Sequence, residues 1–233
     1  MLSVEQFFQT LLELGVSTPA GIKLPTEREL ARLTGLSRAT VREYLSALRI
    51  MGLLNKTQGS ANILHAPTEE SSGAIYGLLL QLNHATEADA VEAREMFEIG
   101  MMPFVCRRIG PGDIERLTAC VDRMTAASRA GDAQEGIEAD LAFHRALFQS
   151  LNNPMIDFAF AGLRTLLRDA LAVRRQQALQ AEIRRNNGVA PEFFATDTVH
   201  LQVVDALLHH DPQASVAAMT FHYQQFRDLV SAD

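Results

Sequence analysis

The sequence has little cysteine and no long apolar run, and both absences narrow the class of protein. Its 233 residues include two cysteines, Cys106 and Cys120, too few for a disulfide framework and without CxxC spacing. We expect both to be buried thiols in a reducing compartment. Apolar stretches such as 75–80 fall far short of the ~20 residues that cross a bilayer. No basic region followed by an apolar region opens the chain, so we expect a cytoplasmic protein without membrane contact.

Positive charge is also scarce overall, but it is unevenly distributed. The whole chain has a formal net charge of −7. Residues 1–66 contain seven basic and five acidic residues, a net charge of +2, whereas the remainder carries 14 basic and 23 acidic residues, a net charge of −9. A basic N-terminal part on an acidic body predicts a polyanionic partner for that one end.

Helical spacing of apolar residues dominates the pattern, so the predicted fold is mainly α. The N-terminal part is expected to contain helices over 3–14, 27–33 and 38–51, a loop over 16–25, and a hairpin of strands over 53–56 and 61–64. Thr26 and Glu29 form a capping box before the second helix, Gly35 breaks it, and Ser37 caps the third.

The remainder reads as an all-α bundle of about seven helices. A polar segment with one proline, residues 67–72, is expected to be a linker between a domain over 1–66 and a domain over 73–233. Apolar faces packing inward would form the bundle. Its helices are predicted over 73–83, 87–109, 113–130, 134–151, 154–175 or longer, 195–209 and 213–231.

Residues 26–51 have the order that a helix-turn-helix requires, and the start of its second helix is suited to DNA. This first turn carries two hydroxyls, Ser37 and Thr40, and two guanidinium groups, Arg38 and Arg42. Arginine can form paired hydrogen bonds with guanine, while hydroxyls and the free amides of a helix start suit phosphate. The alternative is a solvated helix surface, which the capping box, the turn glycine and the hairpin disfavour.

The stretch GIKLPTERELARLTGLSRATVREYLSALRIMGLL, residues 21–54, resembles the GntR winged-helix regulators. Their signature is leucine-proline-serine/threonine-glutamate-arginine, then serine-arginine, then valine-arginine-glutamate and a glycine before the wing. The wing departs from the family pattern, because it reads QGSANIL where glycine-x-glycine is usual. The resemblance implies contacts with double-stranded operator DNA from Arg28, Ser37, Arg38, Thr40 and Arg42, and from Gly59 at the wing tip.

The body contains one carboxylate and three histidines whose spacing is compatible with a metal site. Asp140 and His144 are four residues apart, ~400° around a helix, so they share one face. His200 and His222 lie on the last two predicted helices, which Asp211–Pro212 folds back on each other. If those helices face the 134–151 helix, the four side chains converge; otherwise they are ordinary core or surface residues.

The same region resembles the FCD ligand-binding domain of the FadR branch of these regulators, in DLAFHRALFQSLNNP, HLQVVDAL and ASVAAMTFH. The resemblance implies a helical bundle that holds a divalent metal through Asp140, His144, His200 and His222. Zinc suits these ligands, with nickel and manganese as alternatives. Arg94, in EAREMFE, corresponds to an arginine that the family commonly carries and would pair with a small organic acid; the alternative is a salt bridge with Glu98 at i+4.

These observations predict a homodimeric transcriptional repressor rather than an enzyme. Its affinity for the operator would be controlled by a small carboxylate effector bound at the metal. One alternative is a metal-dependent hydrolase with an accessory nucleic-acid-binding domain, although HExxH, a nucleophile elbow and a phosphate-binding loop are all missing from the sequence. The other is a DNA-binding protein whose metal is purely structural. Whether small acids change the DNA affinity separates this last alternative from the effector-controlled repressor.

Overall fold

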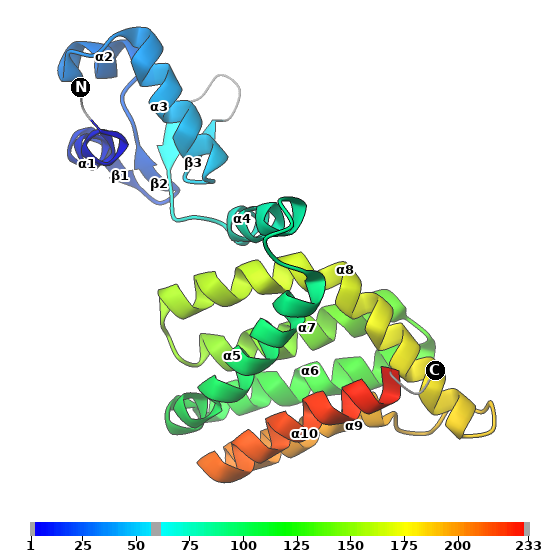
Figure 1. Cartoon of the computed structure of the whole chain (residues 1–233). Coiled ribbons are helices and arrows are strands. Elements are labelled where there is room, and N and C mark those ends of the chain that lie inside the picture. The colour runs from blue at the N-terminus through cyan, green and yellow to red at the C-terminus, as the bar shows by residue number, and fades with distance from the viewer. Residues whose placement is uncertain (1–2, 57–61, 231–233) are drawn as a thin grey trace. The chain divides into compact units, whose positions relative to one another are not determined.

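The computed structural model describes residues 3–56 and 62–230, which fold as parts of two compact units, Met1–Ser72 and Gly73–Asp233 (Figure 1). The described residues form ten helices and four short strands. The predicted class, mainly α with an N-terminal helix-turn-helix and a C-terminal helical body, is confirmed. None of the described helices combines the length and the apolar character needed to cross a bilayer.

The N-terminal unit packs three helices against a small antiparallel sheet with strand order β1-β2-β4-β3. Its core consists of buried apolar side chains from every helix and from the sheet: Phe7, Leu11, Leu24, Leu30, Val41, Leu45, Leu48, Leu54 and Leu64. The elements are α1 (Val4–Leu14), β1 (Val16–Thr18), β2 (Gly21–Lys23), α2 (Glu27–Thr34), α3 (Arg38–Ile50), β3 (Leu54–Lys56) and β4 (Asn62–Leu64).

Local capping fixes the helix-turn-helix, as the sequence predicts. Thr26 and Glu29 form the reciprocal capping box of α2, and the Ser37 side chain accepts a hydrogen bond from the backbone of Thr40 at the start of α3. Gly35 ends α2 with φ of +70°, a left-handed conformation that glycine adopts without strain. The boundaries of both helices therefore agree with the prediction to within one residue.

The predicted loop over 16–25 is wrong, because β1 and β2 form a hairpin there. Strand β2 also pairs with β4, with Ile22 opposite Leu64. The β1–β2 hairpin is therefore part of the same sheet as the β3–β4 hairpin. Gly21 has φ of +121°, and a Cβ there would lie 2.4 Å from the carbonyl oxygen of Leu64. The strands have three residues each and depend on a partner about 40 residues away, so no local periodicity reveals them.

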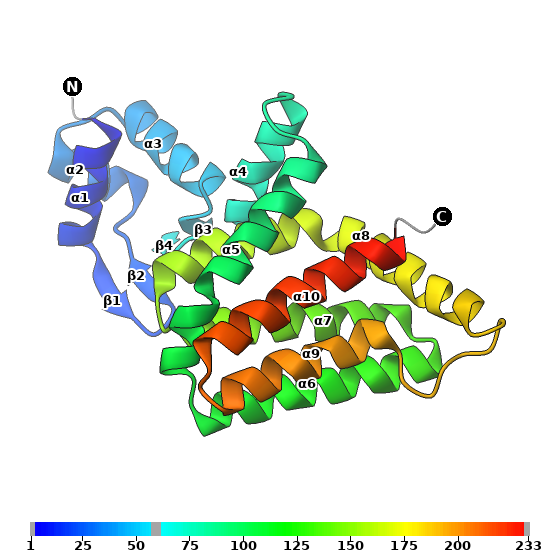
Figure 2. The same cartoon turned by 60° about the horizontal axis from the view of Figure 1, so that its bottom comes forward.

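The second unit consists of helices, as predicted. Helices α6, α7, α9 and α10 lie side by side, and α5 packs on α10 while α8 packs on α7 (Figure 2). Met102, Leu117, Phe143, Val203 and Met219 are fully buried in its core. The elements are α4 (Glu69–Gln81), α5 (Glu87–Arg108), α6 (Pro111–Ala130), α7 (Ala133–Gln149), α8 (Pro154–Arg185), α9 (Ala195–Leu208) and α10 (Pro212–Val230).

The segment 67–72, predicted to be a linker, is largely helical because α4 begins at Glu69. Thr68 supplies the reason: its hydroxyl accepts a hydrogen bond from the backbone of Ser71, and its own backbone N–H donates to the Ser71 hydroxyl at 2.8 Å. These paired bonds satisfy amides at the helix start. The carboxylates of Glu69 and Glu70 lie in the first turn, where they interact favourably with the positive end of the helix dipole. Polar composition alone therefore misplaces the first helix by four residues.

Candidate functional site

The arginines predicted to contact DNA lie on the surface of the N-terminal unit. Arg28 on α2 and Arg38 and Arg42 on α3 are all exposed. Arg42 keeps a side chain that is 61% exposed, and its Nε lies 3.4 Å from Glu27 Oε2. A surface ion pair of this kind contributes little to stability, so Arg42 can exchange Glu27 for a phosphate at small cost.

Ser37 and Thr40 are brought together at the start of α3. The Ser37 hydroxyl accepts the Thr40 backbone N–H at 3.1 Å and lies 2.9 Å from the Thr40 hydroxyl. The Ser37 hydroxyl therefore caps α3 and the Thr40 hydroxyl contacts that cap, while the phosphate contacts of both residues stay a prediction. Gly59, predicted at the wing tip, lies outside the described residues.

One hydrogen bond beside this surface is not predicted from the sequence. Arg49 on α3 donates from Nη2 to Asn62 Oδ1 at 3.0 Å, and Asn62 is buried at the start of β4. The bond links β4, the second strand of the predicted wing hairpin, to α3, the second helix of the motif. The two residues are 13 positions apart and follow no periodic pattern, so a local sequence pattern does not predict their contact.

In the body, the three predicted histidine ligands converge from three helices. His144 comes from α7, His200 from α9 and His222 from α10, and one ring nitrogen of each lies within 4.8 Å of the others. All three side chains are buried. The ring centroids of His200 and His222 are 4.5 Å apart, and those of His144 and His222 are 5.2 Å apart. The condition that the sequence left open, that these helices face one another, is therefore met.

The buried nitrogens of this histidine cluster fit a divalent ion. Nε2 of His144, Nε2 of His200 and Nδ1 of His222 are buried and have no hydrogen-bond partner among the described residues. Leaving such groups unpaired is costly, and a metal ion would satisfy them. Three imidazoles and one carboxylate are a donor set that zinc accepts in tetrahedral geometry.

The fourth predicted ligand, Asp140, stands beside the cluster. Its Oδ1 lies 3.4 Å from His200 Nε2, and its side chain is 15% exposed. Burial alone would raise the pKa of this carboxyl, but the polar contact with His200 and the nearby charges of His144, His200 and Arg175 hold the pKa well below its usual range. Asp140 is thus an ionised carboxylate, the form that binds a metal.

A hydrogen bond orients the imidazole of His200, and a close contact with a carboxylate orients that of His144. His200 Nδ1 lies 3.0 Å from the carbonyl oxygen of Asp197, to which it donates, so Nε2 is left for a metal. His144 Nδ1 lies 2.6 Å from Glu98 Oε2, which leaves Nε2 of His144 for the same use. Burial lowers the pKa of His222 well below its ordinary value, and the charges of His200 and His144 add to this effect. His222 is therefore a neutral imidazole, as metal binding requires.

Arg94 occupies a buried ion pair on α5. Its Nε donates to Glu98 Oε1 at 2.7 Å, and the two side chains are 4% and 0% exposed. The pair predicted as the alternative role for Arg94 is therefore present, while its contact with an effector remains a prediction. Burial alone would raise the pKa of Glu98, but the charge of Arg94 and the contacts with His144 and Tyr223 lower it to about 2.

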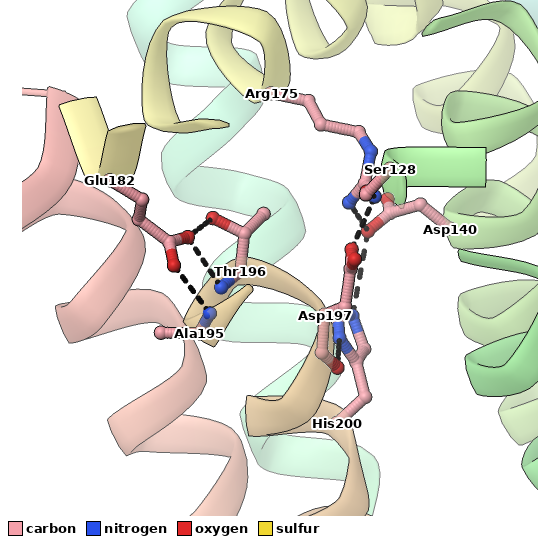
Figure 3. Close-up of polar contacts among 8 residues, drawn as sticks. All are labelled: Ser128, Asp140, Arg175, Glu182, Ala195, Thr196, Asp197 and His200. Carbon is pink, nitrogen blue, oxygen red and sulfur yellow. Dashed lines mark hydrogen bonds and ion pairs between the residues drawn. The ribbon is translucent and has the colours of Figure 1, made fainter. Parts of the chain in front are cut away.

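A second buried ion pair, absent from the sequence prediction, joins α8 to α9 (Figure 3). Arg175 pairs with Asp197 and donates to the Ser128 hydroxyl at 3.0 Å, and its Nη1 lies 3.9 Å from Asp140 Oδ1. Because the Asp197 carbonyl orients His200, the pair connects two of the predicted ligands. Beside it, Glu182 accepts the backbone N–H groups at the start of α9, including that of Thr196 at 2.8 Å.

A cavity of about 130 Å³ opens next to the cluster. Its lining combines the predicted ligands and basic groups with an apolar wall. The lining residues include Asp140, His144, His222, Arg94, Arg174, Arg175 and Arg227, with Val91, Leu171, Tyr223 and Phe226. A small anion with an apolar part has the dimensions and chemistry that this cavity accepts.

Comparison with protein families matches both parts of the chain. The model of the bacterial regulatory proteins of the gntR family matches residues 10–62, and the model of the FCD domain matches residues 89–225. These ranges contain the helix-turn-helix and the histidine cluster, respectively. The two resemblances predicted from sequence are therefore confirmed.

Individual relatives agree with this assignment. The chain is 27% identical to the HTH-type transcriptional regulator YcbG of Bacillus subtilis (strain 168), over 91% of this chain and 82% of that protein. It is 28% identical to the HTH-type transcriptional repressor NanR of Cronobacter sakazakii, over 87% and 74%. The solved structure of Streptococcus agalactiae GntR has the same fold, with a TM-score of 0.69 and 22% identity over 97% of each chain. These proteins are regulators and not enzymes, and the present chain belongs to the GntR family of bacterial transcriptional regulators, with an FCD domain as its C-terminal body.

Proposed function

We propose that the protein is a homodimeric, metal-dependent repressor whose affinity for its operator is controlled by a small carboxylate effector. One observation carries this proposal: in the FCD domain, three buried imidazoles with unpaired nitrogens stand beside a cavity lined by buried arginines. The repressor NanR is among the relatives of this chain, which supports the direction of control. The recognition helix is α3, with Arg28 of α2 contributing from the first helix of the motif.

Arg38 and Arg42 are proposed to act differently on DNA. If Arg38 forms paired hydrogen bonds with a guanine, Arg38→Ala should cost about 1–3 kcal/mol of binding free energy on the operator and relax the preference at that base. If Arg42 holds a phosphate, Arg42→Ala should weaken all DNA sequences alike and reduce the salt slope by about one. Fluorescence anisotropy with an operator selected from random DNA, repeated over a range of salt concentrations, measures both effects.

Arg116→Ala is a matched control for these variants, because Arg116 is an exposed arginine on α6 of the body. It should leave both the affinity and the salt slope unchanged. Wild-type affinity and salt slope in both Arg38→Ala and Arg42→Ala would remove the assignment of α3 as the recognition helix.

The effector is proposed to complete the coordination of the ion and to pair with a buried cation. When bound, the metal supplies a Lewis-acidic centre for a carboxylate oxygen. Asp140, His144, His200 and His222 would hold the ion, and Arg94 would face the effector from α5. Zinc is the proposed ion, and nickel or manganese would use the same donors.

Control of DNA binding requires that the effector distinguish two arrangements of the dimer. We propose that α4 and the residues before it, which join the two units, transmit that difference to the recognition helices. A typical coupling of about 1–3 kcal/mol corresponds to a change of roughly 5–150-fold in DNA affinity. A twofold dimer would read two half-sites one helical turn of DNA apart, or a multiple of it.

An exposed apolar face supports the dimer. Ile75, Leu78, Leu79 and Leu82 recur at the spacing of one helical face, on α4 and just after it, and are 53%, 53%, 42% and 63% exposed. Large apolar side chains clustered on one exposed face are typical of an interface between proteins.

Thermal unfolding tests the effector part of the proposal. Zinc-loaded protein is screened with small carboxylic acids, with and without a chelator, since a ligand that binds the folded state raises its melting temperature. We expect at least one acid to stabilise the loaded protein and to lose this effect after chelation. If no acid stabilises the loaded protein, the proposed effector class is wrong.

A further inference from the structure

The buried charges of the FCD domain are balanced in pairs. Among the described residues, the buried arginines are Arg94 and Arg175, and the buried acids are Glu98 and Asp197. Arg94 pairs with Glu98, and Arg175 pairs with Asp197. Each pair is neutral as a whole, so neither leaves a net charge to attract an anion.

One further charge faces the cavity from the metal cluster. A carboxylate ligand binds a metal in its deprotonated form, so Asp140 contributes −1, and histidine ligands enter a metal site as neutral imidazoles. With a divalent ion in place, Asp140 and the ion together carry a net charge of +1. The other arginines of the cavity have acidic partners: Arg174 Nη2 lies 3.6 Å from Glu87, and Arg227 Nη1 lies 2.5 Å from Glu95.

We propose that the loaded cavity selects an anion with a single carboxylate, and that the Arg175–Asp197 pair sets this limit. The inference rests on the proposed function, since it presumes an acid effector at the metal. One carboxylate neutralises the net charge of +1. A second carboxylate would lie without a counter-ion in a cavity of about 130 Å³ whose wall includes Val91, Leu171 and Phe226. An unpaired charge in such surroundings is strongly disfavoured.

Arg175 is also placed to hold the one carboxylate. It lines the cavity, and its Nε and Nη1 are buried without a hydrogen-bond partner among the described residues. Its Nη2 is used by Asp197 and Ser128. Nη1 lies on the side of Asp140, 3.9 Å from its Oδ1, so a carboxylate oxygen of the ligand would give this donor an acceptor, which an unpaired buried group requires. Asp197 therefore holds Arg175 in place and also cancels its charge.

Isothermal titration calorimetry on the zinc-loaded full chain tests the limit with an isosteric pair of acids. Malate and its 4-amide, malamate, have almost the same shape, but malamate lacks the second negative charge. Lactate serves as a smaller acid with one carboxylate. We expect wild-type protein to bind malamate about tenfold or more tightly than malate, and to bind lactate as well.

Asp197→Asn raises the net charge of the loaded cavity to +2 while keeping an oxygen that can accept from Arg175. The preference for malamate over malate should then fall by about tenfold or more. The double variant Arg175→Gln/Asp197→Asn restores a net charge of +1, so it should regain the preference for malamate even if both acids bind more weakly. Asp122→Asn, on the exposed surface of α6, makes the same change in total charge and should leave the preference unchanged.

Zinc content and helical circular dichroism are measured for each variant. Equal or tighter binding of malate by the wild-type protein would overturn the inference, and this result does not depend on any variant folding. An unchanged preference for malamate over malate in Asp197→Asn protein that is folded and zinc-loaded would also overturn the inference. If none of the three acids binds although the screen finds a stabilising acid, the inference is refuted and the proposed function stands. If the screen finds no acid either, both are refuted. Tight binding of malate alone would leave the proposed function intact and refute only the charge limit.

Discussion

Glu98→Ala is expected to lower the free energy of unfolding by about 3–5 kcal/mol, the typical cost of removing one partner of a buried ion pair. The variant would leave Arg94, which is 4% exposed, without its counter-ion. It would also remove the carboxylate that lies 2.6 Å from His144 Nδ1 and orients that imidazole. Urea denaturation of metal-free protein measures the loss without a contribution from metal binding.

The same carboxyl gives stability a pH dependence with a defined sign. The pKa of Glu98 is about 2 in the folded protein against 4.5 as the ordinary value, so this group binds protons more readily when the chain is unfolded. Its contribution is therefore complete above about pH 4.5 and is lost as the pH falls toward about 2. Glu98→Gln should lack this part of the acid-induced loss, as shown by stabilities measured at pH 6 and at several lower values.

Two controls isolate the ion pair from general damage to α5. Glu92→Ala replaces an exposed glutamate on the same helix and should change the stability by less than about 0.5 kcal/mol. The double variant Arg94→Met/Glu98→Leu removes both charges together and should recover most of the loss. A loss in Glu98→Ala no larger than that in Glu92→Ala would contradict the assignment of a buried pair.

The second large effect concerns the metal ligands. His200→Ala or His222→Ala should reduce the zinc content from about one ion per chain and lower the melting temperature measured with zinc present. With free zinc at about 1,000 times the dissociation constant, binding stabilises the folded state by about 4 kcal/mol. For a chain of this size that stabilisation corresponds to a difference of roughly 10 °C between loaded and stripped protein. Elemental analysis and thermal unfolding measure both quantities.

His209→Ala is the matched control, because His209 follows α9 and its side chain is 67% exposed. This variant should keep the wild-type zinc content and the wild-type response to chelation. Full zinc occupancy in the double variant Asp140→Ala/His144→Ala would mean that the named ligands are wrong.

Local signals in the sequence were sufficient to predict the helices of the motif and of the body. The capping box of Thr26 and Glu29, and the cap of Ser37, act within three residues, so they can be read directly from the chain. The spacing of Asp140 and His144 likewise fixes one helical face. The hairpin of β1 and β2 could not be found this way, because its placement depends on pairing with β4.

The support of the site was beyond prediction for the same reason. Glu98, Arg175 and Asp197 come from α5, α8 and α9, and only the packing of these helices brings them to the histidines. The sequence indicates an i,i+4 pair of Arg94 and Glu98, but only the folded domain shows that both side chains are buried. The sequence spacing of two ionisable residues that form a buried ion pair is the same as that of two residues on a solvated helix face. The spacing therefore does not predict their burial.

The most direct test of the central claim is the operator affinity of the full-length protein, measured by fluorescence anisotropy with and without a stabilising carboxylate. The measurement is made on zinc-loaded protein and on protein stripped of metal. We predict that the acid changes the affinity of the loaded protein by roughly 5–150-fold, and that the stripped protein still binds DNA but no longer responds. An acid that shifts operator affinity equally in both preparations would show that control does not pass through the cluster of Asp140, His144, His200 and His222.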